Sequence, residues 1–194
     1  MSVPYVIEEK KNGQERVYDL FSRLLRDRII FVKGVIDASL ADSVVAQLLF
    51  LESDSSTKDI YMYINSPGGS VNDMYAIYDT MNYIKPDVTT IGFGKCMSAA
   101  SFLLAAGTKG KRYCLPNLNL MIHELSSGVD GKFKDMKNYH KYLEFLHDKM
   151  AKHYVKFTGQ KLTKIKKDME LDYFMSAEEA KKYGLVDEVQ YNRK

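Results

Sequence analysis

The chain has 194 residues, enough for one domain with a substantial hydrophobic core. Apolar residues make up 45% of the chain and charged residues 27%, a composition that excludes an intrinsically disordered protein. The formal net charge is only +3, so we expect neither nucleic acid nor an anionic membrane surface as a partner.

The cysteines and the first residues indicate the compartment. Cys96 and Cys114 lack the spacing of metal ligands and form no disulfide framework, which favours a reducing compartment. Residues 1–16 become charged before an apolar segment develops, so we expect no cleaved secretory signal. No run in the sequence reaches the roughly 18 apolar residues of a membrane span. We therefore expect a soluble, cytoplasmic protein.

The first two thirds of the chain alternate between strand and helix patterns. Short β-branched and aromatic runs predict strands at 28–33, 60–65, 88–93 and 117–123. Apolar residues with helical spacing predict helices at 40–51, 71–84 and 98–106. The SPGGS stretch at 66–70 and Gly94 predict turns from strand to helix. Because a helix lies between successive strands, the pattern predicts parallel βα units and an α/β domain.

The last third has a different pattern. Residues 132–157 place apolar side chains three or four positions apart and predict one long amphipathic helix. At 1.5 Å per residue this helix measures about 39 Å, so we expect it to project from the domain. Its apolar stripe, which includes Phe133, Leu143 and Leu146, then needs cover from another subunit. Residues 176–189 predict a capped helix that ends at Gly184 and a final strand.

Ser98 is a candidate nucleophile, because it lies where a strand leads into a helix. The N-terminus of that helix presents unpaired N–H groups and the positive end of the helix dipole, which stabilise an oxyanion. The GKCMS stretch is not the GxSxG motif of a nucleophile elbow, and an ordinary N-cap serine has the same position. Ser101 is the competing candidate, although one turn inside the helix it is expected to pack in the core.

A general base has to come from one of the 4 histidines. His140, His147 and His153 lie among lysines and glutamates in the long helix, where we expect solvated surface positions. His123 instead ends the apolar strand LNLMIH, and active sites of open α/β sheets collect at such carboxyl ends. The sequence pattern leaves two readings of His123 open, a catalytic base or a strand-end histidine satisfied by backbone.

The Pro67-Gly68-Gly69 turn has the flexibility that lets backbone approach a substrate closely. Beside Ser98, it would supply a second oxyanion N–H from another strand end. Many plain turns have the same composition. The 25 Asp and Glu residues leave the orienting carboxylate undetermined.

A family resemblance distinguishes between these candidate catalytic residues. The longest stretches that carry it are FSRLLRDRIIF at 21–31, YINSPGGSV at 63–71, IYDTMNYIKPDV at 77–88, SFLLAAGTKGKR at 101–112 and MSAEEAKKYGLVDEV at 175–189. Shorter ones are VAQLLFLES at 45–53, LPN at 115–117, MIH at 121–123 and TGQ at 158–160. Together they cover nearly the whole chain, which resembles the proteolytic subunit of the Clp protease.

The resemblance implies a serine peptidase with Ser98 as nucleophile, His123 as base and Asp172 as orienting acid. It also implies that the backbone N–H groups of Gly69 and Ala99 form the oxyanion hole, in agreement with the turn and the helix N-terminus. No metal or cofactor is implied for the chain itself, because ATP is used by the partner unfoldase.

The resemblance further implies an architecture and partners. We expect a single domain with a crotonase-like ββα superhelix head at 1–122 and 160–194, a protruding handle helix within about 123–159, and an N-terminal axial loop at about 1–18. The handle would join two heptameric rings into a tetradecamer, which an AAA+ unfoldase feeds with unfolded polypeptide. The location implied is a bacterial cytoplasm, or an organelle stroma or matrix.

Three tyrosines are the expected docking site of the unfoldase on the outer face of the ring, namely Tyr61, Tyr63 and Tyr113. Exposed aromatic clusters with a polar rim serve as interaction sites. The alternative is that these tyrosines are ordinary core residues.

The chain departs from the family pattern near the expected site. Residues 95–97 read Lys-Cys-Met before the serine, where the family has other residues, and Glu124-Leu125 stands where the family has Gln-Pro. Ser127-Gly128 replaces a glycine pair. Leu171 replaces an arginine that pairs across the rings, so we expect ring stacking to rely on apolar contact instead of that ion pair.

Three functions are therefore weighed. The first is an active peptidase that degrades proteins when an unfoldase feeds it and cleaves short peptides alone. The second is a divergent paralogue that acts mainly as a structural ring partner of a second peptidase subunit. The third, a crotonase-fold acyl-CoA enzyme, is disfavoured by the combination of Ser98, His123 and Asp172.

Overall fold

The computed structural model describes residues 3–9, 13–128 and 130–192. Its strands are β1 (Tyr5–Glu9), β2 (Glu15–Asp19), β3 (Ile29–Ile36), β4 (Ile60–Gly69), β5 (Val88–Met97), β6 (Arg112–Cys114), β7 (Asn119–Ile122), β8 (Tyr173–Ser176) and β9 (Glu188–Val189). Its helices are α1 (Leu20–Arg26), α2 (Ala38–Asp54), α3 (Val71–Tyr83), α4 (Ala99–Ala105), α5 (Phe133–Thr158), α6 (Leu162–Met169) and α7 (Ala177–Tyr183). Within those described residues, no helix is long and apolar enough to cross a membrane.

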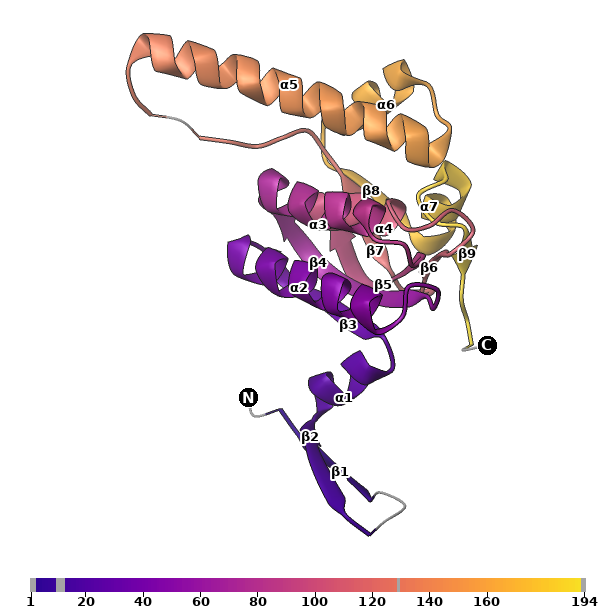
Figure 1. The fold of residues 1–194 in the computed structure, drawn as a ribbon. Helices are drawn as coiled ribbons and strands as arrows, with labels where there is room; N and C mark the ends of the chain where they lie inside the picture. The colour runs from indigo at the N-terminus through magenta and orange to yellow at the C-terminus, as the bar shows by residue number, and fades with distance from the viewer. Residues whose placement is uncertain (1–2, 10–12, 129, 193–194) are drawn as a thin grey trace.

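In the described part of the chain, a 7-stranded sheet forms the body of the fold (Figure 1). The order is β3-β4-β5-β6-β9, with β7 beside the last part of β5 and β8 beside β7. Neighbouring strands are parallel except β7 and β8, which are antiparallel. The mixed α/β class predicted from the sequence is confirmed.

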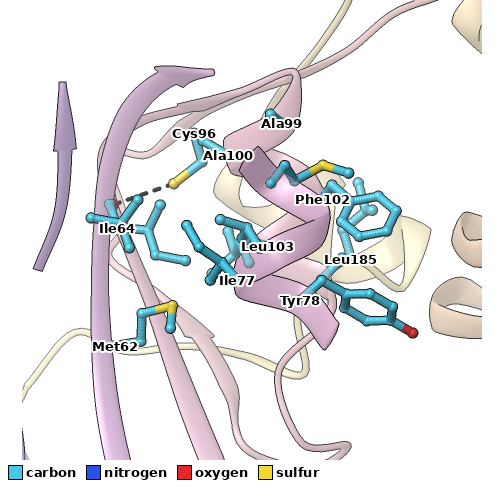
Figure 2. Packing of buried hydrophobic residues seen from close by; sticks show 14 of the residues in the cluster. Met62, Ile64, Ile77, Tyr78, Cys96, Ala99, Ala100, Phe102, Leu103 and Leu185 are labelled. Carbon is cyan, nitrogen blue, oxygen red and sulfur yellow. Dashed lines mark hydrogen bonds between the residues drawn. The ribbon is translucent and has the colours of Figure 1, made fainter. Parts of the chain in front are cut away.

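Helices cover one face of the sheet. Met62 and Ile64 of β4 point into this core, where they lie near Ile77 of α3 and Leu103 of α4 (Figure 2). Every residue of α4 is buried, so this short helix lies wholly inside the fold. The helix that follows Ser98 is thus held on all sides by packing.

The opposite face of the sheet is less covered. Alternate residues of β3, β4 and β5 point there, and the rings of Phe31, Tyr63 and Phe93 lie side by side across the three strands. On this side α1 packs through contact of Phe21 with Phe31. Parallel sheets are normally covered on both faces, so this surface is suited to a contact outside the subunit.

Two strands extend further than the sequence predicts, and the turns predicted at 66–70 and at Gly94 are wrong. β4 continues to Gly69, because Gly68 and Gly69 adopt φ angles of 97° and 156° and still pair with β3. A side chain at Gly69 would lie 2.1 Å from the Ile36 carbonyl oxygen, so glycine is required. β5 bends at Gly94, with φ 65°, and then pairs with β7 up to Met97.

The segment predicted as an N-terminal axial loop contains the antiparallel hairpin of β1 and β2, which stands away from the sheet (Figure 1). The side chains of Arg23 and Arg26 on α1 hold this hairpin through Glu8. Residues 1–2 and 10–12 of the predicted loop lie outside the described residues.

α5 is 26 residues long and has two unlike halves. Its C-terminal half lies on the body of the fold, while its N-terminal half extends past the sheet (Figure 1). Phe133 and Phe145 are exposed, at 76% and 62%. Leu146 is only 7% exposed within its own chain, so the prediction that it needs cover from another subunit is wrong.

Several short elements have no clear sequence signal, among them β6, α6 and β8. β6 contains the buried Arg112, whose side chain gives no apolar pattern. Arg112 donates to both carboxylate oxygens of Asp187 and to the carbonyl oxygens of Ala105, Phe157 and Gly184. One buried guanidinium thus ties together the C-terminal ends of α4, α5 and α7.

Candidate active site

Ser98 lies at the sharp bend between β5 and α4. Its φ of 56° and ψ of −125° are angles that residues with a side chain rarely adopt. Its N–H donates to the carbonyl oxygen of Met121 on β7 at 2.9 Å, which holds the bend in place. A strained bend from strand to helix is the backbone that projects a nucleophilic serine.

The side chain of Ser98 makes no helix-capping hydrogen bond, so the alternative of an ordinary N-cap serine is wrong. Its Oγ lies 2.9 Å from Nε2 of His123 instead. The competing Ser101 is fully buried, as expected, and bonds within the core.

Strand pairing brings His123 and Asp172 to the same place. Met97 of β5 pairs with Met121 of β7, so Ser98 and His123 both lie just beyond the carboxyl ends of two parallel strands. Ile122 pairs with Tyr173 of the antiparallel β8, which sets the preceding Asp172 opposite His123. Asp172 Oδ1 lies 3.3 Å from His123 Nδ1. The three expected residues therefore form one chain of contacts.

Backbone N–H groups from two elements lie around Ser98. A side chain at Gly68 would lie 2.7 Å from Ser98 Cβ, so β4 passes directly beside the serine. Gly68 donates to the Ser66 hydroxyl and Ser70 donates to Ile36 of β3. Gly69, the expected oxyanion donor, follows Gly68 in the same stretch of β4. Ala99 supplies the first N–H of α4.

The acid end of this arrangement is open to solvent. Asp172 is 58% exposed at its side chain, and the neighbouring Leu171 is 81% exposed. An open depression of about 690 Å³ is lined by both residues together with His123 and Glu124. Glu124, which departs from the family pattern, thus shares a surface with the histidine.

The three predicted docking tyrosines are also brought together, away from Ser98. Tyr61, Tyr63 and Tyr113 line one cavity of about 320 Å³, with Ile29 and Ile91 among its other residues. Tyr61 is exposed, and the other two are half-buried. They are therefore not ordinary core residues.

The remaining histidines and the cysteine nearest the serine occupy different surroundings. His140 is exposed and His147 half-exposed, but the expectation of a solvated His153 is wrong. His153 packs against the rings of Tyr78 and Phe157, and its pKa is lowered by burial and then by nearby lysines. Cys96 is fully buried, and burial raises the pKa of its thiol, which makes it a poor nucleophile.

The sequence did not reveal two residues that hold the backbone at and beside the nucleophile. The Met121 carbonyl fixes the Ser98 N–H, and the Ser66 hydroxyl bonds the N–H of Gly68. A backbone carbonyl carries no residue-specific signal, so only the pairing of β5 and β7 reveals the first. The SPGG stretch gave a signal for the second, since a serine beside glycines often bonds nearby backbone.

Comparison with known families agrees with this geometry. A model of the Clp protease family matches residues 12–193, which is almost the whole chain. The parallel sheet is consistent with the crotonase-like fold expected from the resemblance. The chain, with Ser98, His123 and Asp172 gathered at the strand ends, belongs to the Clp protease family of peptidases.

Proposed function

We propose that the chain is the subunit of a serine endopeptidase in which Ser98 is the nucleophile, His123 the base and Asp172 the orienting acid. The 2.9 Å contact between Ser98 Oγ and His123 Nε2 carries the proposal. A base within hydrogen-bond reach turns a weakly nucleophilic hydroxyl into an attacking group. Membership of the Clp protease family supports a peptide bond as the substrate.

Each step follows from these contacts. Ser98 Oγ attacks the carbonyl carbon of the scissile peptide bond while its proton passes to Nε2 of His123. The N–H groups of Gly69 and Ala99 stabilise the negative oxygen that forms. His123 returns the proton to the departing amine, and the peptide stays attached to Ser98 as an ester. A water molecule then loses a proton to His123 and its oxygen attacks the ester carbon. The bond from that carbon to Ser98 Oγ breaks, His123 returns the proton to Oγ, and the second product leaves as a carboxylic acid.

Asp172 would hold His123 in the tautomer that leaves Nε2 free to accept a proton. Its 3.3 Å contact with Nδ1 supports that role. These groups supply nucleophile, base and oxyanion donors, and the proposal includes no metal or cofactor bound to this chain.

We propose that the active form is a stack of two heptameric rings, a tetradecamer, that degrades unfolded polypeptides. Exposed Phe133 and Phe145 on the projecting half of α5 support contact between the rings, and the open aromatic face of the sheet supports further burial on assembly. An AAA+ unfoldase would hydrolyse ATP and deliver the substrate. The expected location is the cytoplasm or an organelle matrix.

The unfoldase would dock in the cavity lined by Tyr61, Tyr63 and Tyr113. Replacing Tyr63 with alanine should weaken unfoldase-dependent protein degradation by about tenfold, since a buried aromatic anchor dominates such contacts. Hydrolysis of short peptides should stay at the wild-type rate. Equal loss of both activities in a paired assay would show that the tyrosine serves folding instead of docking.

The alternative is a divergent paralogue that acts as a structural partner in a mixed ring. The Ser98 to His123 contact within a single chain favours the active enzyme over this alternative. Leu171 and the open acid end are the features that favour the structural partner.

The test is hydrolysis of a fluorogenic short peptide by the purified chain, with particles viewed by negative stain. We expect turnover by the wild type and a loss of about 10⁴-fold or more in Ser98→Ala, with unchanged rings. Inactive rings that become active on mixing with a second paralogue would favour the structural partner. Turnover in Ser98→Ala near the wild-type rate would assign catalysis to another residue.

A further inference from the structure

A line of hydrogen bonds joins α5 to the backbone of Ser98. Tyr154, on the buried half of α5, is 1% exposed, and its hydroxyl lies 3.0 Å from Ser101 Oγ. Ser101 is fully buried on α4, and its Oγ donates to the carbonyl oxygen of Ser98 at 2.7 Å. Two buried hydroxyls thus end on the peptide group that follows the nucleophile.

The donor and the acceptor of each hydrogen bond in this line follow from the chemistry of the groups. A serine hydroxyl has one proton, and a carbonyl oxygen can only accept. Since Ser101 donates its proton to the Ser98 carbonyl, Ser101 Oγ has to accept from Tyr154. Tyr154 is therefore the donor, and burial raises the pKa of its hydroxyl, so the proton stays on it at neutral pH.

The Ser98 carbonyl and the Ala99 N–H belong to the same planar peptide group. Any rotation of the carbonyl about the strained Ser98 backbone therefore rotates the Ala99 N–H by the same angle. The carbonyl accepts from two groups, the Phe102 N–H at 3.2 Å and the Ser101 hydroxyl at 2.7 Å. The shorter bond is the one that depends on the hydroxyl line.

We propose that Ser101 and Tyr154 are positioning residues that orient the Ala99 N–H toward the oxyanion. This inference rests on the proposed function, in which Ala99 is an oxyanion donor. A hydrogen bond to the carbonyl of a peptide also polarises its N–H, which strengthens that donor. Because Tyr154 lies on α5, a displacement of this helix reaches the oxyanion hole through two side chains.

A neighbouring tyrosine provides the matched control. Tyr75 is also buried and packs against the ring of Phe102, as Tyr154 does. Among the described residues, its hydroxyl has no hydrogen-bond partner. Tyr75→Phe and Tyr154→Phe each remove one buried hydroxyl from the same aromatic cluster, but only the second interrupts the line to Ser98.

The experiment measures peptide hydrolysis and the affinity of a peptide boronate, which forms a tetrahedral adduct on serine, in assembled rings. We expect Tyr154→Phe and Ser101→Ala each to lower kcat by about twofold to tenfold, with KM unchanged. This factor is what the loss of one hydrogen bond gives. Boronate affinity should fall by the same factor, because both depend on the oxyanion donors. The double variant should lose little more than Ser101→Ala alone.

The proposal is overturned if both single variants keep the wild-type kcat. It is also overturned if Tyr75→Phe lowers kcat as much as Tyr154→Phe, or if KM rises while kcat holds, since each result indicates a general packing effect. Failure of the proposed function has a different signature, because Ser98→Ala would then retain turnover. Thermal unfolding of each variant identifies any that fail to fold. Tyr154→Phe is the milder change, because it keeps the aromatic ring and removes only the hydroxyl.

Discussion

The two ring nitrogens of His123 contact very different surroundings, one rigid and buried and the other open to solvent. On one side, Ser98 lies 2.9 Å from Nε2, and its backbone is fixed by Met121 of β7 and by the buried α4. On the other side, Asp172 lies 3.3 Å from Nδ1 on a surface open to solvent. The neighbouring Leu171 is also exposed.

This difference indicates what one subunit provides by itself. The serine side is built from buried strands and a buried helix, which set its geometry through folding alone. The acid side instead lies just before β8, a strand in which only Met175 is buried. We infer that contact with another copy completes the acid side, and the predictions below alter one side at a time.

The largest effect is expected from removing the acid. Asp172→Asn should lower kcat for a short peptide by about 10² to 10⁴-fold, because the amide no longer favours the tautomer that accepts the serine proton. Glu170→Gln removes a nearby carboxylate from the same depression and should leave the rate unchanged. A wild-type rate in Asp172→Asn would exclude this residue from catalysis.

A smaller effect is expected from separating the two proposed rings. Phe133→Asp combined with Phe145→Asp places two charges in the exposed apolar surface of α5 and should split the double ring. Peptide hydrolysis should fall about tenfold, because the acid side loses its cover. Leu146 of the same helix is unsuitable for this test, because it is buried within its own chain.

Sedimentation velocity measures the splitting, with Lys152→Asp on the buried half of α5 as the charge control. The wild-type double ring should also survive high salt, because buried apolar area contributes about 25 cal/mol per Å² and an exposed ion pair at most about 1 kcal/mol. Splitting of the wild type by salt, or intact double rings in the double variant, contradicts the apolar contact.

The last prediction concerns stability at low pH and the pair of Arg112 and Asp187, in which Arg112 also bonds the end of α4. Burial alone would raise the pKa of Asp187, but hydrogen bonds from Arg112 and its charge lower it below the ordinary 3.8. The carboxylate therefore stabilises the fold fully at neutral pH, and this contribution is lost as the pH falls through 3.8 toward the lower folded value.

Asp187→Asn should thus cost about 2 kcal/mol in the free energy of unfolding at pH 7, with a difference from wild type that narrows below pH 4, as a partly buried charge pair would give. Urea unfolding at several pH values measures this. The exposed Asp42→Asn is the control. A constant difference across the pH range would mean that Asp187 acts through packing alone.

Much of the fold was predictable because its strands and helices repeat a strong apolar pattern. The βα units around 60–106 and the length of α5 follow from periodicity, which depends only on which face is buried. The predicted turn at 66–70 was wrong because Gly68 and Gly69 bend without leaving the ladder. β8 was missed because its four residues, which pair with β7, show a mostly exposed pattern.

Some residues of the candidate site were likewise predictable from the sequence pattern and others were not. Ser98 and His123 could be selected from strand ends, because parallel strands end at one edge of a sheet. Asp172 could not, since it enters through the antiparallel pairing of β8, and only the family resemblance pointed to it. The line from Tyr154 through Ser101 joins residues 53 positions apart and has no sequence pattern at all.

The most direct test of the account is the site of reaction with a fluorophosphonate, which labels only an activated serine. Purified wild-type rings would be treated with the probe and the modified peptide identified by mass spectrometry, with Ser98→Ala treated in parallel. The account predicts one adduct per subunit on Ser98, none in Ser98→Ala, and slower labelling when Phe133 and Phe145 are both aspartate. Labelling of another serine, or no labelling of the wild type, would contradict the claim that this chain carries its own nucleophile.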